Sequence, residues 1–561
     1  MDRRQFLHQS LSVIAASQLR AKESELNCDL LIVGGGVGGF AAALAGCRQG
    51  MRVVLTEETD WIGGQLTAQA VPPDEHPWIE QFGSTRSYRD YRTAVRDYYR
   101  HHYPLTGQAA GKPDLNPGNG TVSRLTHEFR VSVAVLEGIL APYAGSGQLR
   151  VLLRHVPESA TVNGDRVTSI TLTDLHQGTK RTISAPYFID ATELGDLLPL
   201  TKTEFITGAE AQAQTGEMHA LPTPQAENSQ SFTFCFAVDF TEGEDHTIER
   251  PRDYQFWRDY IPKLTPPWTG PLLSWAMCDP KTLHLREVSF TPNPQTASGG
   301  EGLNLWLYRR IADRTNFIPG AYRSDITLVN WPQNDYWLGD LVTADPPRRK
   351  ELLQSAKQLS LSLLYWMQTD APRPDGGHGW KGLRLRKDIV DTEDGLAKSA
   401  YIRESRRIEA EFTILEQHVG TEMRAQSSRK SKEELSAETF ADSVGIGCYR
   451  IDLHPSASGI NYIDISSLPF QIPLGALIPK RVENLLPACK NIGTTHITNG
   501  CYRLHPVEWN IGEAAGSLAS YATERKTNPR AIRNSKGLLG DFQRRLVQTG
   551  FELAWPRIHP V

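Results

Sequence analysis

The sequence contains no apolar run long enough to cross a lipid bilayer. It also has no excess of positive charge, because 60 lysine and arginine residues stand against 64 aspartate and glutamate residues, for a formal net charge of −4 at pH 7. Nucleic-acid-binding surfaces need a basic field, and this composition supplies none. We therefore expect no membrane span and no nucleic-acid partner.

Cysteine is scarce, with 7 residues in a chain of 561. None of them forms a CxxC pair, so the sequence offers no zinc ribbon, no redox dithiol and no clustered iron–sulfur motif. We expect no metal site and mostly buried free thiols, although spacing alone leaves a disulfide open. The cysteines are Cys28, Cys47, Cys235, Cys278, Cys448, Cys489 and Cys501.

The most organised stretch runs from residue 29 to residue 57. A short apolar run rich in β-branched residues predicts a buried parallel strand, and the alanine-rich stretch after the glycines predicts a helix. Gly34, Gly36 and Gly39 fill the three glycine places of a dinucleotide fingerprint, which serve the tight turn, the approach of a diphosphate and close helix–strand packing. Gly38 lies in the same turn, and the helix N-terminus attracts phosphate. An ordinary βαβ unit is the minority interpretation.

An acidic residue ends the second strand of this unit. Glu57 stands where a carboxylate accepts hydrogen bonds from ribose hydroxyls, and Glu58 follows it. The next loop contains Gly63 and Gly64, followed by Gln65. A glycine pair here lets the backbone pass along a diphosphate and a flavin edge, so the loop favours FAD over NAD, between which the fingerprint alone does not choose. A simple turn is the alternative for this loop.

A second glycine fingerprint is missing, so the sequence lacks a separate NAD(P)H domain. Electrons are therefore expected to enter from a small-molecule substrate rather than from a bound nicotinamide. They would leave to an acceptor such as oxygen, a quinone or a protein.

Three later segments are expected to return to the cofactor. Val156 lies in a predicted strand and hairpin, the region where such folds touch the adenine. Asp190, Ala191 and Thr192 follow an apolar strand, in the position of a second short cofactor motif. Asn491 belongs to a strand-and-loop stretch further along the chain.

A small-residue stretch near the C-terminus predicts a helix that approaches the flavin. Its candidate contacts are Gly512, Glu513, Ala514 and Ala515. A helix N-terminus aimed at the flavin pyrimidine stabilises the negative charge that develops on reduction. Close helix packing for steric reasons is the alternative for the same residues.

The N-terminus carries the arginine pair Arg3-Arg4 and then a weakly apolar stretch, which resembles a twin-arginine export signal. We therefore expect export to the periplasm, with a cytoplasmic location as the alternative. The expected regions are a signal at 1–22, the first part of an FAD-binding domain at 27–215, an inserted substrate or cap domain at 220–400, the return to the FAD-binding domain at 401–525 and a tail at 526–561.

Several motifs resemble those of FAD-dependent oxidoreductases with a two-dinucleotide fold of the glutathione-reductase type. The resemblance implies an α/β fold with a Rossmann-like FAD-binding domain and an inserted α+β substrate or cap domain. It extends to the flavin subunits of heterodisulfide reductases, whose iron–sulfur cysteine motifs this sequence lacks, and it names no substrate. The motifs are Ile62-Gly63-Gly64-Gln65, Asp190 to Asp196, Asn228-Ser229-Gln230-Ser231, Asn330-Trp331-Pro332, Tyr401 to Arg407 and Arg503 to Gly516.

Hydride transfer from an alcohol or amine also requires a base that removes a proton, and histidine is suited to that task near neutral pH. His505 is the first candidate, followed by His454 and His496, with a structural hydrogen-bonding role as the alternative for each. Arg503 and Arg403 are candidates for stabilising an anionic group.

Three hypotheses about function follow from these residues. The first is an FAD-dependent oxidoreductase that oxidises a small alcohol, sugar or amine by hydride transfer to flavin N5. The second is an FAD-dependent reductase that receives electrons from a partner donor and saturates a substrate bond. The third is a non-enzymatic carbohydrate-binding protein that uses the tryptophan-rich region between residues 220 and 400.

Overall fold

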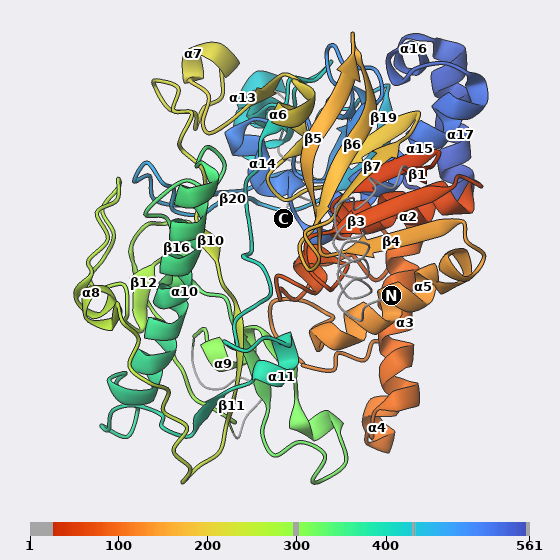
Figure 1. Ribbon diagram of the computed structural model, residues 1–561. Coiled ribbons are helices and arrows are strands. Elements are labelled where there is room, and N and C mark those ends of the chain that lie inside the picture. Colours follow the sequence, from red (N-terminus) through yellow and green to blue (C-terminus); the bar gives the residue numbers. More distant parts are fainter. Residues whose placement is uncertain (1–25, 295–301, 429–430, 432–433, 557–561) are drawn as a thin grey trace, which may run out of the picture.

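The computed structural model describes residues 26–294, 302–428, 431 and 434–556. The predicted export signal at residues 1–22 lies outside the described residues. Figure 1 shows a parallel sheet with its helices on one side of the view and a separate group of strands around one long helix on the other side.

The central sheet has five parallel strands in the order β23-β8-β2-β3-β4. Both faces of β2 are buried, as its uninterrupted apolar run predicts, because alternate residues of a strand point to opposite faces of the sheet. Leu30 and Ile32 enter one hydrophobic core, and Leu31 and Val33 enter another. The strands are β2 (Leu30–Val33), β3 (Val53–Glu57), β4 (Leu149–Leu153), β8 (Tyr187–Asp190) and β23 (Leu485–Pro487).

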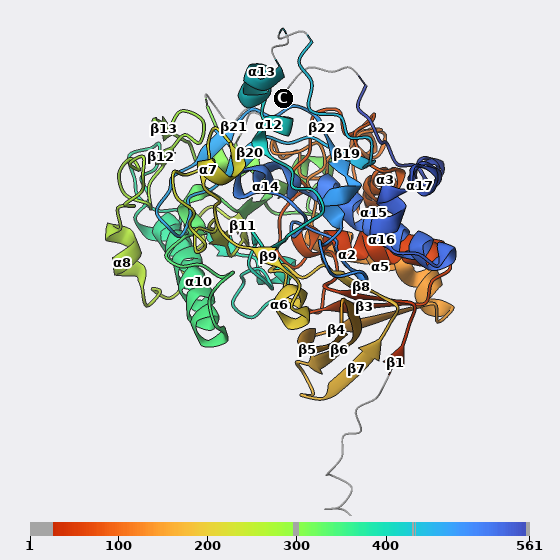
Figure 2. The ribbon, with the colours of Figure 1, turned by 90° about the horizontal axis from the view of Figure 1, so that it is seen from above.

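Helices cover one face of this sheet, and a second sheet covers the other (Figure 2). The second sheet has the strand order β1-β7-β6-β5 and includes the hairpin predicted around residue 164. The layers are therefore helix, parallel sheet and β-sheet, which confirms the predicted α/β class. The helices are α2 (Val37–Arg48), α3 (Arg86–His102), α5 (Phe129–Gly145), α15 (His505–Arg525) and α17 (Lys536–Thr549), and the strands are β1 (Leu26–Asn27), β5 (His155–Asn163), β6 (Arg166–Asp174) and β7 (Lys180–Ser184).

The tryptophan-rich region forms its own hydrophobic core between a four-stranded sheet and helix α10 (Pro346–Thr369). The sheet has the order β14-β15-β11-β17, with β14 (Arg310–Ala312), β15 (Ile326–Val329), β11 (Phe236–Phe240) and β17 (Leu383–Leu385). Most of the tryptophans fill this core rather than a surface, as expected for large aromatic side chains. They include Trp257, Trp268, Trp306, Trp331, Trp337, Trp366 and Trp380.

Short elements complete the described chain. None of its helices is long and apolar enough to cross a membrane, and all cysteines are buried free thiols, as predicted. The remaining elements are η1 (Gly64–Leu66), α4 (Gly107–Ala110), α6 (Leu197–Thr201), β9 (Phe205–Ile206), α7 (Gln212–Thr215), β10 (Phe232–Thr233), α8 (Tyr254–Asp259), β12 (Ala276–Cys278), β13 (Leu285–Glu287), α9 (Leu305–Tyr308), η2 (Arg314–Asn316), η3 (Pro332–Asn334), β16 (Asp335–Tyr336), α11 (Lys387–Val390), β18 (Arg407–Ile408), α12 (Glu416–Val419), α13 (Thr421–Ser428), β19 (Ser443–Gly447), β20 (Ile451–Leu453), β21 (Ile463–Ile465), β22 (Phe470–Pro473), η4 (Leu474–Leu477), α14 (His496–Tyr502) and α16 (Pro529–Asn534).

Helices α2 and α15 pack with their backbones in close contact. A Cβ atom at Gly512 would lie 1.9 Å from the carbonyl oxygen of Gly38, and one at Gly516 would lie 2.4 Å from that of Ala42. Such distances leave no space for a side chain, so the glycines set the separation of the two helices. The small-residue stretch predicted to face a flavin is therefore used at Gly512 for helix packing.

We predict that Gly512→Ala lowers the free energy of unfolding by about 1–3 kcal/mol, because the added methyl group forces α15 away from α2. Gly138→Ala is the matched control. Gly138 is an exposed residue inside α5 with nothing within 4 Å of an added Cβ, so this change should stabilise the protein by about 0.5–1 kcal/mol. Denaturant unfolding measures both effects, and equal stability of Gly512→Ala and the wild type would contradict the packing argument.

Candidate functional site

The glycine turn between β2 and α2 contains two glycines packed against backbone and a third whose nearest neighbour is a side chain. Gly34 has φ +100°, and a Cβ there would lie 2.1 Å from the carbonyl oxygen of Ala191. A Cβ at Gly39 would lie 1.9 Å from the carbonyl oxygen of Gly34. At Gly36, the N-cap of α2, the nearest atom would be Glu193 Oε1 at 3.1 Å. Gly36 thus borders the space that a diphosphate at this helix N-terminus requires.

The second glycine loop lies directly against this turn. The backbone N–H of Gly63 donates to the carbonyl oxygen of Gly35 at 2.7 Å, and a Cβ at Gly64 would lie 2.8 Å from Gly36 Cα. Gln65 Nε2 then donates to the carbonyl oxygen of Arg503 at 3.0 Å, just before α15 begins at His505. The loop therefore joins the glycine turn, which is the predicted nucleotide-binding turn, to the C-terminal segment.

The acid at the end of β3 is buried beside the turn. Glu57 accepts hydrogen bonds from the backbone N–H of Gly35 at 2.9 Å and from the N–H and hydroxyl of Thr59 at 2.8 Å each. Burial raises the pKa of Glu57 to about 7, and these hydrogen bonds oppose the shift. Glu58, the next residue, is exposed. Glu57 thereby fixes the conformation of the turn.

The predicted second motif shapes the neighbouring strand end. Asp190 Oδ1 accepts from the N–H and hydroxyl of Thr192, at 3.0 and 2.7 Å, and Oδ2 accepts from Leu197 N at 3.1 Å. Asn491 Nδ2 donates to the carbonyl oxygen of Asp190 at 3.0 Å. These bonds hold Ala191 against Gly34, so this motif and Asn491 support the glycine turn from the neighbouring strand.

A buried lysine links three segments at this sheet edge. Lys490 Nζ lies 2.5 Å from Glu193 Oε2 and 3.3 Å from Glu508 Oε1. Burial disfavours the charged ammonium, but the two carboxylates more than compensate and raise the pKa of Lys490 above its ordinary value. The lysine therefore carries its positive charge next to the glycine turn.

Several predicted cofactor contacts lie elsewhere in the structure. Helix α15 begins at His505, so Glu513, Ala514 and Ala515 lie beyond its second turn rather than at its N-terminus. Glu513 accepts a 2.5 Å hydrogen bond from the hydroxyl of Ser87. Gly38 packs against the carbonyl oxygen of Ala488, at 1.6 Å from an added Cβ, as well as against α15. Val156 lies in β5, paired with Thr173, and is half-buried.

A cavity of about 460 Å³ lies between the aromatic core of the tryptophan-rich region and the start of α15. The candidate catalytic residues Arg403, His454 and Arg503 all line it, although they come from separate parts of the chain. Its other walls include Trp331 and tyrosine side chains. Each arginine that lines the cavity lies within 4 Å of an aspartate. The pairs are Arg286 and Asp279, Arg309 and Asp74, Arg403 and Asp335, Arg450 and Asp464, and Arg503 and Asp452.

His454 is held between two of these aspartates. Its Nδ1 lies 2.6 Å from Asp335 Oδ2, and its Nε2 lies 3.5 Å from Asp452 Oδ2. Burial alone would raise the pKa of Asp335, but the Arg403 guanidinium and His454 hold it below its usual range. His454 and Arg503 do the same for Asp452. Both carboxylates are therefore ionised and flank the imidazole.

The two other candidate histidines have different environments. His505 is fully buried, and burial lowers its pKa to about 3, so the ring is neutral. Its Nδ1 accepts from the backbone N–H of Asp74 at 3.0 Å, which leaves the proton on Nε2. A ring in this tautomer donates at Nε2, so His505 is not placed to act as the base. His496 Nδ1 bonds to Glu404 at 2.9 Å, and His496 does not line the cavity.

Sequence reasoning missed several residues of the cavity. Asp335 is the first residue of β16, which follows the Asn330-Trp331-Pro332 motif, and nothing in the sequence indicated that it would meet His454. Arg309 and Asp74 stand in stretches without any motif. Among the described residues, no group of three or more metal-binding side chains is arranged to hold a metal ion.

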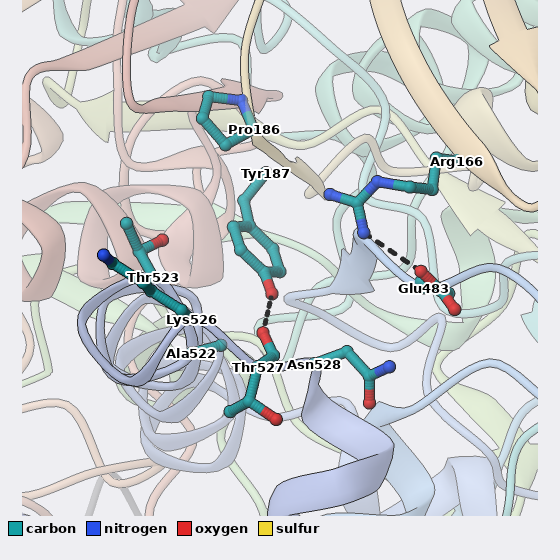
Figure 3. A pocket seen from close by; sticks show the side chains of 9 residues that line it. All are labelled: Arg166, Pro186, Tyr187, Glu483, Ala522, Thr523, Lys526, Thr527 and Asn528. Carbon is teal, nitrogen blue, oxygen red and sulfur yellow. Dashed lines mark hydrogen bonds and ion pairs between the residues drawn. The ribbon is translucent and has the colours of Figure 1, made fainter.

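A depression of about 560 Å³ lies at the amino ends of strands β8 and β23 (Figure 3). Tyr187, the first residue of β8, donates from its hydroxyl to the carbonyl oxygen of Thr527 at 3.0 Å, and Arg166 pairs with Glu483 at 3.0 Å. Ligands of open α/β sheets bind at the carboxyl ends of the strands, whereas this depression is at the amino end. We therefore assign no site to it.

No curated protein sequence matches the chain. Among solved structures, quinol fumarate reductase from E. coli aligns over 94% of this chain and 74% of its own length, with 12% identity and a TM-score of 0.30. L-proline dehydrogenase from P. horikoshii aligns over 34% of this chain, which spans only 25% of that protein, with 15% identity and a TM-score of 0.17. Glycerol-3-phosphate dehydrogenase from Bacillus halodurans, complexed with FAD, aligns over 40% and 42%, with 14% identity and a TM-score of 0.22. These likenesses are too distant to bear on activity.

A family model described as FAD dependent oxidoreductase matches residues 29–546, which is most of the chain. It covers the glycine turn, the tryptophan-rich region and α15 alike. The predicted cofactor, fold and enzyme class are thereby confirmed, and a non-enzymatic carbohydrate-binding protein is set aside. The chain belongs to the FAD-dependent oxidoreductase family, and its cofactor is FAD.

Proposed function

We propose that this protein oxidises a small alcohol, sugar or amine in the cavity lined by His454. The observation that carries the proposal is the position of His454 between two ionised aspartates, in a cavity that also contains Arg503. The Arg503 backbone is bonded to the Gln65 loop beside the nucleotide-binding turn. The cavity that contains His454 is thereby connected, through Arg503, to the loop beside the glycine turn.

The residues of the nucleotide-binding turn fit FAD. Gly36 is the N-cap of α2 and has a side chain rather than backbone as its nearest neighbour, and Glu57 would be the carboxylate for the ribose. When bound, FAD supplies the acceptor for the substrate hydride at its N5. Gln65 and Arg503 would hold its ring end, because they join the glycine loop to the cavity.

His454 would take the proton that a hydroxyl or amine loses as its hydride departs. Asp335 accepts from Nδ1–H and fixes the ring, so Nε2, which lies 3.5 Å from Asp452 Oδ2, is the nitrogen that would meet the substrate. The positive charge that His454 gains is balanced by Asp335 and Asp452. This arrangement supports proton abstraction more directly than it supports any role of His496.

The reverse direction uses the same residues, with His454 as the proton donor to an unsaturated substrate. No observation in the structure favours it, so we retain oxidation as the proposal. Anaerobic mixing decides between them, because an oxidisable substrate bleaches the flavin band near ~450 nm and an unsaturated substrate restores it in the pre-reduced enzyme.

We predict that Gly36→Val abolishes retention of FAD while the protein still folds. An added side chain at Gly36 would meet the movable carboxylate of Glu193 rather than backbone, so it would fill the diphosphate space without breaking the turn. Absorbance of the purified protein measures the FAD content. Gly138→Val in exposed α5 is a control for a glycine-to-valine change and should retain FAD. Full FAD occupancy in Gly36→Val would refute this assignment of the diphosphate site.

We predict that His454→Gln slows flavin reduction by about 10²–10⁴-fold, the range typical of a lost general base, with FAD content unchanged. Stopped-flow absorbance without oxygen measures the rate. His378→Gln, at an exposed loop residue away from the cavity, should match the wild type. A wild-type rate in His454→Gln would exclude His454 as the base.

A further inference from the structure

We propose that the substrate carries a carboxylate, and that Arg309 is the residue that binds it. The proposal deepens the function proposed above, because it uses the same cavity. It rests on a buried guanidinium that lines the cavity and has two nitrogens, Nε and Nη1, without a hydrogen-bond partner among the described residues.

Arg309 and its neighbour Arg310 show the difference between an unsatisfied and a satisfied buried arginine. Both are 8% exposed. Arg310 donates to Gly118 and forms ion pairs of 2.8 Å with Asp313 and Asp325. In the described part of the chain, Nε and Nη1 of Arg309 have no hydrogen-bond partner, and its ion contact is Asp74 at 3.5 Å. Two adjacent arginines with equal burial thus differ in how many of their N–H groups have acceptors.

Leaving such a group unsatisfied is costly. A buried polar group without a hydrogen bond costs about 1–3 kcal/mol by protein mutational measures, and more when it is charged. A structural arginine would have acquired acceptors as Arg310 did. Arg309 instead lines a cavity that a ligand can enter.

The chemistry of the ligand follows from the donors around it. Nε of Arg403 and of Arg503 and Nδ2 of Asn330 also have no acceptor among the described residues, and all three residues line the cavity. The Trp331 indole N–H and the Tyr462 hydroxyl in the lining also lack a partner. All of these groups can donate, so an acceptor would satisfy each of them. Six basic side chains line the cavity against four acidic ones: Lys281, Arg286, Arg309, Arg403, Arg450 and Arg503 against Asp74, Asp279, Asp452 and Asp464.

A carboxylate fits Arg309 better than a neutral hydroxyl does. The guanidinium lies over the ring of Tyr308, with Cζ 5.1 Å from the ring centroid, so the aromatic ring covers one of its faces. Its edge remains for the ligand, and the planar fork of N–H donors along that edge matches the two oxygens of a carboxylate. The substrate would therefore be a hydroxy or amino acid, with the carboxylate at Arg309 and the oxidisable group near His454.

The test measures binding of acetate and of acetamide, which has the same shape without the charge, to the FAD-loaded protein by calorimetry and by perturbation of the flavin absorbance. Acetate should bind the wild type and acetamide should not. Arg309→Met should weaken acetate binding by roughly 10- to 100-fold, the range for a lost charge-assisted hydrogen bond. Arg286→Met, at a half-exposed arginine of the same cavity paired with Asp279, should change it less than about threefold.

A stability measurement separates a binding role from a structural one. Arg309→Met leaves Asp74 without its ion contact, so the comparison is made in the Asp74→Asn background. Adding Arg309→Met there should leave the thermal midpoint unchanged or raised, because an unsatisfied buried charge is removed. Arg310→Met should lower it, since two buried aspartates lose their partner. A marked fall with Arg309→Met in that background would assign Arg309 a structural role and overturn the proposal.

The remaining outcomes distinguish this proposal from the proposed function. Equal binding of acetate and acetamide, or unchanged acetate binding in Arg309→Met, would overturn the carboxylate proposal even if neutral alcohols reduce the flavin. Conversely, acetate binding that depends on Arg309, together with no flavin reduction by hydroxy or amino acids, would support the carboxylate site and refute the oxidase direction. Inorganic phosphate binding more tightly than acetate would overturn the choice of carboxylate.

Discussion

The close backbone contact between α2 and α15 is the interaction on which the site depends. Gly38 and Gly512 meet where neither can carry a side chain, and Gly516 repeats the contact at Ala42. Because α2 begins at the nucleotide-binding turn, this contact places the start of α15 next to it. The bond from Gln65 to Arg503 then closes the space between the two helix N-termini. Steric packing in the helix interior thus fixes the geometry of a site at its end.

The charges of the cavity are arranged around one histidine. Arg403 and Arg503 each pair with an aspartate that also contacts His454, so the imidazole lies in a network of alternating sign. Such a network keeps both carboxylates ionised despite their burial, because each has a cationic partner within hydrogen-bonding range. It also holds together the C-terminal segment and the tryptophan-rich region, which supply Arg503 and Asp335.

The sequence predicted the nucleotide-binding half of the fold because its signals are local. Gly34, Gly36 and Gly39 act within one turn, and the apolar strands around them have the composition of buried parallel strands. Two glycines of this turn pack against backbone, and the nearest neighbour of the third is a side chain. The small residues around Gly512 were harder to interpret, since both a cofactor and a neighbouring helix require the absence of side chains.

The cavity could not be derived in the same way, because its residues are far apart in the chain. Asp335, His454 and Arg403 come from segments that no spacing rule connects, and their pairing depends on how the tryptophan-rich region packs. The order of His505 and His454 as candidate bases could not be judged from the sequence for a related reason. Only the structure shows that Asp74 donates to His505 Nδ1 and that burial keeps this ring neutral. Arg309 gave no local signal, because its distinctive property is a lack of partners.

The strand order of the central sheet affects when its parts can fold during synthesis. The edge strand β23 and helix α15 follow β2 and α2 by more than four hundred residues, yet they complete the same sheet and the same helix pair. The first βαβ unit leaves the ribosome early, but it lacks its packing partner until almost the whole polypeptide has emerged. Contacts of such high sequence separation form late and slowly. The nucleotide groove is therefore finished last, although its fingerprint is translated first.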